Sequence, residues 1–395
     1  MRIDGSGITA RAGMFAVAGV FAVFSLLAHS EAPKAGKGID LLEMPALQSP
    51  KAAHSLLLGV TTAGSRLVAV GERGIVVLSD DQGQTWTQAQ VPVSVTLNAV
   101  HFVSPDLGWA AGGDGVILRT DDGGRSWTKR LDGNQANELV LADLKARIGA
   151  VETAAARASD EEGGRFQAAL ETLGFRLEDA EAGAGFGPSR PLLALWFKDE
   201  RLGFAVGAFG QIFRTDDGGE HWISLAGALE NPDSLHLNAI VRLPDGTLAV
   251  VGERGMIWFS SDEGASWRAN EVGYDGHLYG LIQAEPATLV AFGFAGNVFR
   301  SADGGQTWVK VARISEKSIV GAIHQEDLGV LLVARNGSLI RSRDAGKTFS
   351  ISQQTVGASV ASVLPWPFGA ERKLVAVGHG GVSMISITDD RSDRK

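Results

Sequence analysis

The chain has 395 residues, of which 45% are hydrophobic and 21% are charged, and it carries a formal net charge of −9 at pH 7. This acidic balance argues against a nucleic-acid partner, because proteins hold nucleic acids by neutralising phosphates with basic side chains. The chain has no cysteine, which excludes disulfides and every cysteine-ligated zinc or iron–sulfur site.

The first 30 residues have the pattern of an export signal. Arg2 and Arg11 precede an apolar run over residues 13–28, and Ala28 and Ser30 are the small residues expected before a cleavage site. Because the run is shorter than the roughly 20 residues of a spanning helix, we expect cleavage after Ser30, with a retained anchor as the alternative. Residues 31–38 are expected to form a linker. The sequence therefore predicts a periplasmic protein, with peripheral membrane association also open.

One short string recurs six times along the rest of the chain. It has the form [Ser/Thr]-x-Asp-x-Gly-x-x-[Trp/Phe], known as an Asp box, with its aspartates at Asp81, Asp122, Asp217, Asp262, Asp303 and Asp344 and its aromatic residues at Trp86, Trp127, Trp222, Trp267, Trp308 and Phe349. Neighbouring aromatic residues are 41 or 45 positions apart, except across residues 127–222, where one period carries an insertion. A period of this length is typical of a repeat architecture.

An apolar strand and a glycine turn precede each Asp box, as in residues 67–74 and 203–210. A seventh copy at residues 374–381 has no Asp box. Each repeat contains four short strands, which is typical of a propeller blade, and the Asp box falls on the hairpin between the third and fourth strands. There the aspartate is expected to accept backbone N–H bonds, while glycine takes the left-handed conformation and the aromatic ring packs beneath. We predict an all-β, seven-bladed propeller of four-stranded antiparallel blades over residues 39–387, monomeric, with a tail at 388–395.

Two segments stand outside the repeat. Residues 39–47 are expected to supply the missing outer strand of the seventh blade and so to close the ring. Residues 136–180, between blades two and three, show helical spacing of apolar residues and predict a helical hairpin. This insertion is expected on the face where the glycine turns open.

The glycine turns, aligned by register, present a candidate recognition surface. Residues between the flanking glycines are not required by the turn itself, so charged and aromatic side chains there suggest partner binding, although solvated turn residues are the plainer interpretation. The candidates are Glu72, Arg73, Asp114, Phe209, Glu253, Arg254, Phe294, Arg335, Asn336 and His379, with Tyr274 and His277 from a connection that reaches the same face. A separate set lies just before the Asp boxes and is expected to form hydrogen bonds between blades or within turns: Arg119, Arg214, Arg300 and Arg341.

Enzymatic activity is the main alternative, because Asp boxes also occur in sialidases, which use a tyrosine nucleophile. Arg73, Arg254 and Arg335 resemble a carboxylate-binding triad in number, but they lie at turn tips, and Tyr274 or Tyr279 lacks an identifiable partner. The eight histidines show no metal-ligand spacing. We therefore expect no enzyme, no cofactor and no metal. A sialidase-like glycoside hydrolase, or a ligand- or polysaccharide-binding propeller without turnover, are the alternatives.

The six Asp boxes, second strands such as Gly203-Phe-Ala-Val-Gly207, the export signal and the helical insertion together resemble the photosystem II stability/assembly factor family of propellers, including its relatives in non-photosynthetic bacteria. The resemblance covers residues 39–387 and implies a chaperone-like factor. Photosynthetic members bind a reaction-centre subunit through an arginine-rich face, to which Arg73, Arg254 and Arg335 are comparable, although three acidic residues dilute the charge. Bacterial relatives are associated with envelope transporters. The resemblance thus implies an exported assembly factor or accessory subunit for a membrane protein complex.

Overall fold

The computed structural model describes residues 40–159, 163–188, 190–353, 359–369 and 371–387. The expected export signal, the linker and the tail at 388–395 lie outside the described residues. Among the helices that are described, none combines the length and apolar composition needed to cross a membrane.

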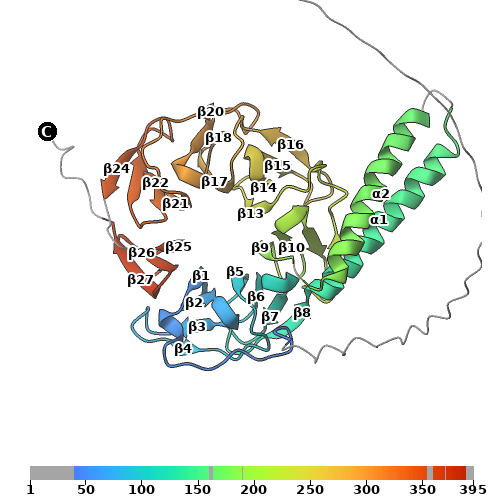
Figure 1. The fold of residues 1–395 in the computed structure, drawn as a ribbon. Coiled ribbons are helices and arrows are strands. Elements are labelled where there is room, and N and C mark those ends of the chain that lie inside the picture. Colours follow the sequence, from blue (N-terminus) through green and yellow to red (C-terminus); the bar gives the residue numbers. More distant parts are fainter. Residues whose placement is uncertain (1–39, 160–162, 189, 354–358, 370, 388–395) are drawn as a thin grey trace, which may run out of the picture. The chain divides into compact units, whose positions relative to one another are not determined.

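The strands form seven antiparallel sheets arranged around a central axis (Figure 1). Blade one holds β1 (Leu57–Ala63), β2 (Arg66–Gly71), β3 (Val76–Ser79) and β4 (Thr87–Gln88); blade two holds β5 (Leu97–Phe102), β6 (Gly108–Gly112), β7 (Ile117–Thr120) and β8 (Thr128–Leu131). Blade three holds β9 (Leu192–Phe197), β10 (Gly203–Gly207), β11 (Ile212–Thr215) and β12 (Ile223–Ser224); blade four holds β13 (Leu237–Arg242), β14 (Leu248–Gly252), β15 (Met256–Ser260) and β16 (Arg268–Glu271).

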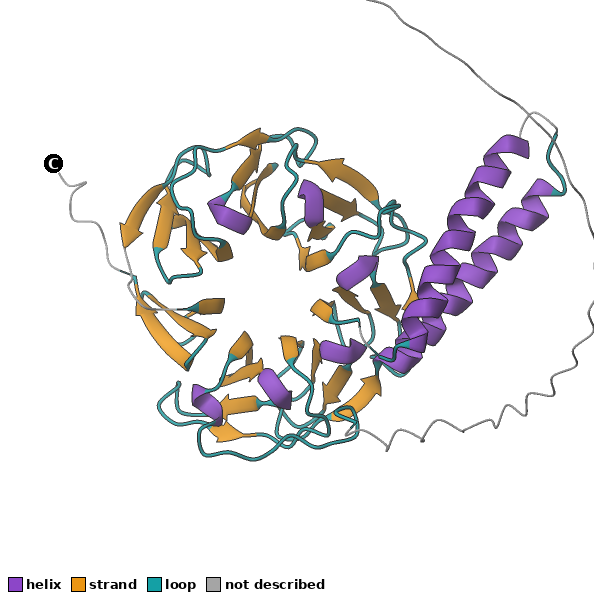
Figure 2. Ribbon diagram, viewed as in Figure 1, coloured by secondary structure: helices purple, strands orange, loops and turns teal. Residues whose placement is uncertain are grey.

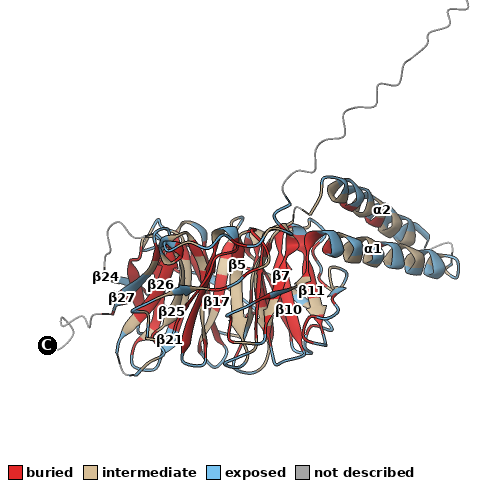
Figure 3. Cartoon of the chain, turned by 90° about the horizontal axis from the view of Figure 1, so that it is seen from below, coloured by how far each residue is buried: buried red, intermediate tan, exposed pale blue. Residues whose placement is uncertain are grey.

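The remaining blades follow the same order from the axis outward. Blade five holds β17 (Leu278–Glu285), β18 (Thr288–Gly293), β19 (Val298–Ser301) and β20 (Val309–Lys310), and blade six holds β21 (Ile319–Gln325), β22 (Gly329–Ala334), β23 (Leu339–Ser342) and β24 (Ser350–Gln353). Blade seven has three described strands, β25 (Val360–Pro365), β26 (Lys373–Gly378) and β27 (Gly381–Ser386). The predicted seven-bladed fold is confirmed. Figure 3 shows the buried residues concentrated within the blades.

The ring closes differently from the expectation, and the predicted closing strand at residues 39–47 is wrong. The amide of Ala46 donates to the carbonyl of Val91 at 2.9 Å, and the amide of Ser94 donates to that of Leu41 at 2.8 Å. Residues 41–46 therefore lie along the connection between blades one and two, where Leu42 and Ala46 are buried. Leu42 and Ala46 could have been buried by an outer strand of blade seven as well as by this connection. In the structure they pack against Val91, Val93 and Val95.

Apolar packing joins blades seven and one. Leu57 and Leu67 of blade one share one hydrophobic cluster with Val375 and Val377 of blade seven. A short 3-10 helix, η1 (Ala52–His54), lies against β27. The approach is so close that a Cβ on Gly381 would lie 1.8 Å from the carbonyl oxygen of Ala53. Only glycine fits there.

The insertion between blades two and three is the predicted helical hairpin, formed by α1 (Gly133–Ala155) and α2 (Gly163–Gly185). Asp132 caps α1 and forms a reciprocal capping box with Gln135. Leu144, Leu173 and Ala180 form the buried contact between the helices. Figures 1 and 3 show the hairpin extending away from the ring of blades.

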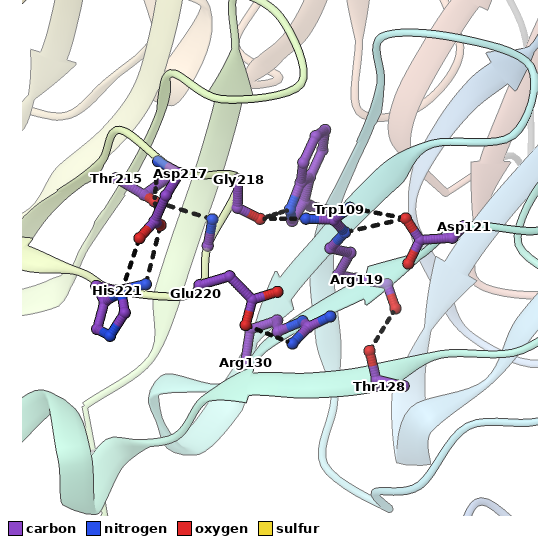
Figure 4. Close-up of polar contacts among 11 residues, drawn as sticks. Trp109, Arg119, Asp121, Thr128, Arg130, Thr215, Asp217, Gly218, Glu220 and His221 are labelled. Carbon is purple, nitrogen blue, oxygen red and sulfur yellow. Dashed lines mark hydrogen bonds and ion pairs between the residues drawn. The ribbon is translucent and has the colours of Figure 1, made fainter.

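Each Asp box is a closed hydrogen-bonded turn, as Figure 4 shows for blade three. The hydroxyl of Thr215 donates to Asp217 at 2.9 Å and accepts from the amide of Gly219 at 2.9 Å. The other carboxylate oxygen of Asp217 lies 2.7 Å from Nδ1 of His221, whose amide also donates to Asp217. Gly219 has φ of 95°, in the left-handed region. In the other five boxes a hydroxyl side chain takes the place of His221: Thr85, Ser126, Ser266, Thr307 and Thr348.

The Asp boxes also join neighbouring blades. Arg119 of blade two donates to the carbonyl of Gly218 in the blade-three box at 3.2 Å, and the indole of Trp109 donates to the same oxygen at 2.9 Å (Figure 4). The same contact recurs from Arg214 to Glu263 and from Arg300 to Ala345. In blade one, where Leu78 has the arginine's place, Arg66 on β2 donates to Gly123 at 2.8 Å instead. From blade four, Asn270 donates to the carbonyl of Gly305 at 2.7 Å, one residue further along the blade-five box.

Candidate functional site

In each blade, the turn between the second and third strands lies directly against the backbone that enters the inner strand. This contact restricts which residues the start of the turn can hold. In blade two a Cβ on Gly112 would lie 2.0 Å from the carbonyl oxygen of Thr96, and the next amide, of Gly113, donates to that oxygen at 2.7 Å. The same bond forms in all seven blades, with donors Glu72, Gly113, Ala208, Glu253, Phe294, Arg335 and His379. Figure 2 shows five of these turns as short helical segments around the ring: η2 (Glu72–Gly74), η3 (Gly113–Gly115), η4 (Ala208–Gly210), η5 (Glu253–Gly255) and η6 (Phe294–Gly296). We call the surface formed by the seven turns the turn face.

The second residue of these five turns has a left-handed backbone, although none is glycine. The φ angles lie between 51° and 55° at Arg73, Asp114, Phe209, Arg254 and Ala295. The expectation that the turn leaves these positions unconstrained is therefore wrong for the backbone. Side chains rarely occupy this region, because the Cβ crowds the carbonyl oxygen. Glycine would relieve that crowding, but all five positions carry a residue with a Cβ.

Two carboxylates of the turn face are bound within the protein. Glu72 accepts the amide of Leu56 at 3.0 Å, and Glu253 accepts the equivalent amide of His236 at 2.6 Å. Glu253 also lies 2.8 Å from Nδ1 of His236 and 3.2 Å from Nε2 of His277, so that it connects blade four with the start of blade five. The carboxylates of these two glutamates therefore point toward the inner strands and bind the amides that directly precede them.

The three arginines of the turn face differ in their surroundings. Arg254 forms an ion pair with Asp233 at 2.5 Å. Arg73 and Arg335 are exposed, and within the part of the chain that the structure describes neither forms an ion pair. Two free guanidinium groups are therefore available to a partner.

Two phenylalanines add apolar surface. Phe209 and Phe294 are each 51% exposed. The ring of Phe209 lies 4.9 Å from that of His236 and 5.2 Å from the guanidinium carbon of Arg190, a cation–π distance. Phe209 is thus held in position while half of its surface faces solvent.

The connection before blade five approaches the turn face as expected. The hydroxyl of Tyr274 donates to the carbonyl of Phe294 at 3.2 Å and accepts from Asn297 at 3.1 Å. Burial raises the pKa of Tyr274 and of Tyr279, which is the opposite of what a tyrosine nucleophile requires. The described residues contain no group of three or more potential metal-ligating side chains.

The other predicted residues of the turn face are placed as follows. Asp114 is half-buried, and burial, with a smaller contribution from the charge of Asp40, raises its pKa. Asn336 accepts the amide of Ser338 at 3.3 Å, and His379 is exposed. Asp233 and His236 were missed from the sequence. His236 and His277 both stand directly before an inner strand, so that aligning this position would have shown both.

The hairpin begins at the turn face but does not cover it. The backbone of Gly133 lies against the carbonyl of Asp114, so α1 starts beside η3. Further along, Arg147 contacts Gly227, and Arg176 donates to the carbonyl of Asn231 at 2.8 Å. The helices therefore pass over the outer part of blade three, and Phe209 stays half exposed.

Comparison with known proteins identifies similar molecules. A family model described as photosynthesis system II assembly factor YCF48 matches residues 78–151 and 188–327, more than half of the chain. A structure of YCF48 bound to D1 peptide is 17% identical with a TM-score of 0.58, over 87% of this chain and 96% of that chain. YCF48 from Cyanidioschyzon merolae is 17% identical with a TM-score of 0.56, over 86% of this chain and 98% of that chain. At this identity the likeness shows the fold alone. No curated sequence matches the chain.

Proposed function

The chain belongs to the photosynthesis system II assembly factor YCF48 family, and on this premise we propose that it is an exported, non-catalytic assembly or accessory factor whose turn face binds a segment of a membrane protein. A structurally similar member is bound to a D1 peptide, which supports a polypeptide as the kind of ligand.

The five left-handed residues carry this proposal. A left-handed conformation costs a non-glycine residue roughly 1–2 kcal/mol, so five side chains at such positions are a stability cost that function would explain. A ring of turns that served only the fold would favour glycine or asparagine there. Instead the positions hold Arg73, Asp114, Phe209, Arg254 and Ala295.

The charge and apolar surface of the turn face favour an acidic partner segment with apolar side chains. Glu72 and Glu253 accept hydrogen bonds from amides of their own chain, so these carboxylates are held by the inner strands and are less available to a partner. Arg73 and Arg335 remain as exposed cations, and Phe209 and Phe294 remain as exposed rings. Arginine and aromatic residues are the side chains most enriched at binding hot spots.

Charge reversal across the turn face tests the proposal. The variant carries Arg73→Glu, Arg254→Glu and Arg335→Glu, and partners are captured from envelope extracts and quantified by mass spectrometry. We expect the partner to fall at least about tenfold, which corresponds to 1.4 kcal/mol. The matched control makes the same change in charge at three exposed arginines away from the turns, Arg125, Arg201 and Arg242.

Equal capture by the two variants would refute the assignment of the turn face. The identity of the captured protein also decides the client. A photosystem subunit would place this protein with the photosynthetic members, whereas a transporter subunit would favour a role in the bacterial envelope. Detection of the mature protein in the periplasmic fraction checks the proposed export.

A further inference from the structure

Arg341 occupies a repeated position without the partner that the repeat normally provides. It lies near the end of β23, where Arg119, Arg214 and Arg300 lie in their own blades, and those three donate to a carbonyl in the Asp box of the next blade. Arg341 is only 5% exposed. Within the described residues its Nε and Nη2 have no hydrogen-bond partner. A buried cation without a partner is strongly unfavourable, so this guanidinium calls for an acceptor.

The strand register shows where that acceptor belongs. In blade three, Gly203 pairs with Thr215, and the carbonyl that receives the arginine lies three residues later, on Gly218. In blade seven the equivalent pair is Leu374 and Ile385. Three residues after Ile385 is Thr388, the first residue of the tail that lies outside the described part of the chain. The unpaired guanidinium therefore belongs beside the start of this tail.

Packing places Arg341 toward blade seven. It pairs with Leu331 across the strands, and Leu331 shares a buried cluster with Leu374 and Ile385 of blade seven. Paired residues on neighbouring antiparallel strands present their side chains to the same face of the sheet. Arg341 thus faces the blade that has no Asp box and no fourth described strand.

A cavity opens beside this guanidinium. Its volume is about 260 Å³, and its polar lining consists of Arg341, Arg343, Asp344, Thr348, Ser350 and Ser352. The carboxylate of Asp344 accepts hydrogen bonds from Ser342 and Thr348 within its own Asp box. Thr348 and Ser352 already donate their hydroxyl protons to Asp344 and to the carbonyl of Leu339. The two guanidinium groups and the hydroxyl of Ser350 remain as donors suited to a carboxylate. The tail that follows Ile387 begins Thr388-Asp389-Asp390 and so supplies two carboxylates within a few residues.

We propose that this cavity is a carboxylate-binding site for the protein's own acidic tail, in which Asp389 and Asp390 accept hydrogen bonds from Nε and Nη2 of Arg341. The carboxylates of the tail would supply the acceptor that the next blade's Asp box supplies to Arg119, Arg214 and Arg300. This site is separate from the turn face, and its occupancy does not depend on the proposed partner.

Cleavage of the tail by trypsin tests the proposal on the full chain. The site after Arg391 must leave the cavity to enter a protease, so release of residues 392–395 measures undocking by mass spectrometry. Arg341→Met is expected to accelerate this release at least about tenfold, equivalent to 1.4 kcal/mol of docking free energy. Asp389→Asn with Asp390→Asn is expected to do the same, and all three changes together are expected to add nothing further.

Arg214→Met is the matched control, because it removes the equivalent guanidinium from a blade whose acceptor, Glu263, is in place and lies outside the cavity. It disturbs a blade junction to a similar degree and should leave tail cleavage unchanged. Cleavage of the Arg341→Met tail at the wild-type rate would overturn the proposal. If the cavity instead binds a free anion, inorganic phosphate should stabilise the wild type, and the tail should be cleaved at the same rate in the wild type and in Arg341→Met. That result would also contradict a docked tail.

Discussion

At the scale of single residues, stability and function compete at the turn face. Arg73 and Ala295 have the same left-handed backbone, with φ of 53° at both, but only one carries a side chain long enough to reach a partner. Glycine at either position removes the crowding of Cβ. It also loses more conformational entropy on folding, which reduces the gain.

We predict that Arg73→Gly and Ala295→Gly each raise the free energy of unfolding by about 0.5–1 kcal/mol. Arg73→Gly should also weaken partner binding, whereas Ala295→Gly should leave binding unchanged. Urea unfolding and partner capture on the same two variants measure both effects. A loss of stability in both variants would mean that the left-handed conformation costs nothing here.

The Asp-box aspartates make stability depend on pH in the acid range. Hydrogen bonds from the hydroxyl and the amide of Thr85 lower the pKa of Asp81 to about 2, and those from Ser266 lower the pKa of Asp262 to about 2. A carboxyl whose pKa is lowered on folding stabilises the protein above its unfolded pKa, here 3.8. That contribution is lost as the pH falls through the folded value.

We therefore predict that the urea midpoint falls as the pH is lowered from about 4 to about 2. Asp81→Asn combined with Asp262→Asn should lower stability at pH 7 and flatten the dependence in this window. Asp275→Asn, at an exposed carboxylate outside the boxes, is the control. An equally steep dependence in the double variant would show that other groups cause the acid unfolding.

At the scale of elements, the hairpin and the turn face are separable. The hairpin base packs on blades two and three through Ala136, whereas the contact between Leu144 and Leu173 lies within the hairpin itself. Beyond that contact, residues 148–155 and 163–170 form the distal ends of the two helices, where Ile148 and Val151 pack against the same cluster.

Replacing residues 148–170 by a short glycine-rich turn, together with Phe175→Ser at an exposed apolar side chain, should leave partner binding within about twofold of wild type. We expect this result because the arginines and phenylalanines proposed to bind the partner lie on the turn face. Helical circular dichroism should fall while the propeller keeps its unfolding midpoint within a few degrees. Loss of the partner with an intact propeller would move the contact to the hairpin.

The repeats made the blades predictable from the sequence. The features that depart from the repeat could not be predicted in this way. Six Asp boxes and a seventh strand-and-turn copy at residues 374–381 determine the blade count, because each repeat forms its own hydrogen bonds locally. The course of residues 40–47 depends on tertiary packing against residues 91–95, which no local pattern records. Arg66 replaces a missing arginine from another strand. The left-handed turn residues were missed because arginine, phenylalanine and alanine carry no sequence preference for that conformation.

At the scale of the whole molecule, the propeller is a ring of blades that presents one set of turns, and hydrogen bonds to the Asp boxes join neighbouring blades. Five of the described blade junctions carry a donor to a box carbonyl, from Arg66, Arg119, Arg214, Asn270 and Arg300. Such a scaffold suits binding without a rearrangement of the blades, because the backbone of the turn residues is already held by the inner strands.

The most direct measurement of the central claim is photo-crosslinking in the intact envelope, with a photoreactive amino acid placed at one exposed apolar position at a time. Phe209 and Phe294, each 51% exposed, lie on the turn face, and Ile223 and Val309, 53% and 70% exposed, lie on outer strands as controls. A membrane protein joined at Phe209 and Phe294 but not at the two controls is the predicted result. Adducts at Ile223 or Val309 without any at the phenylalanines would contradict the account.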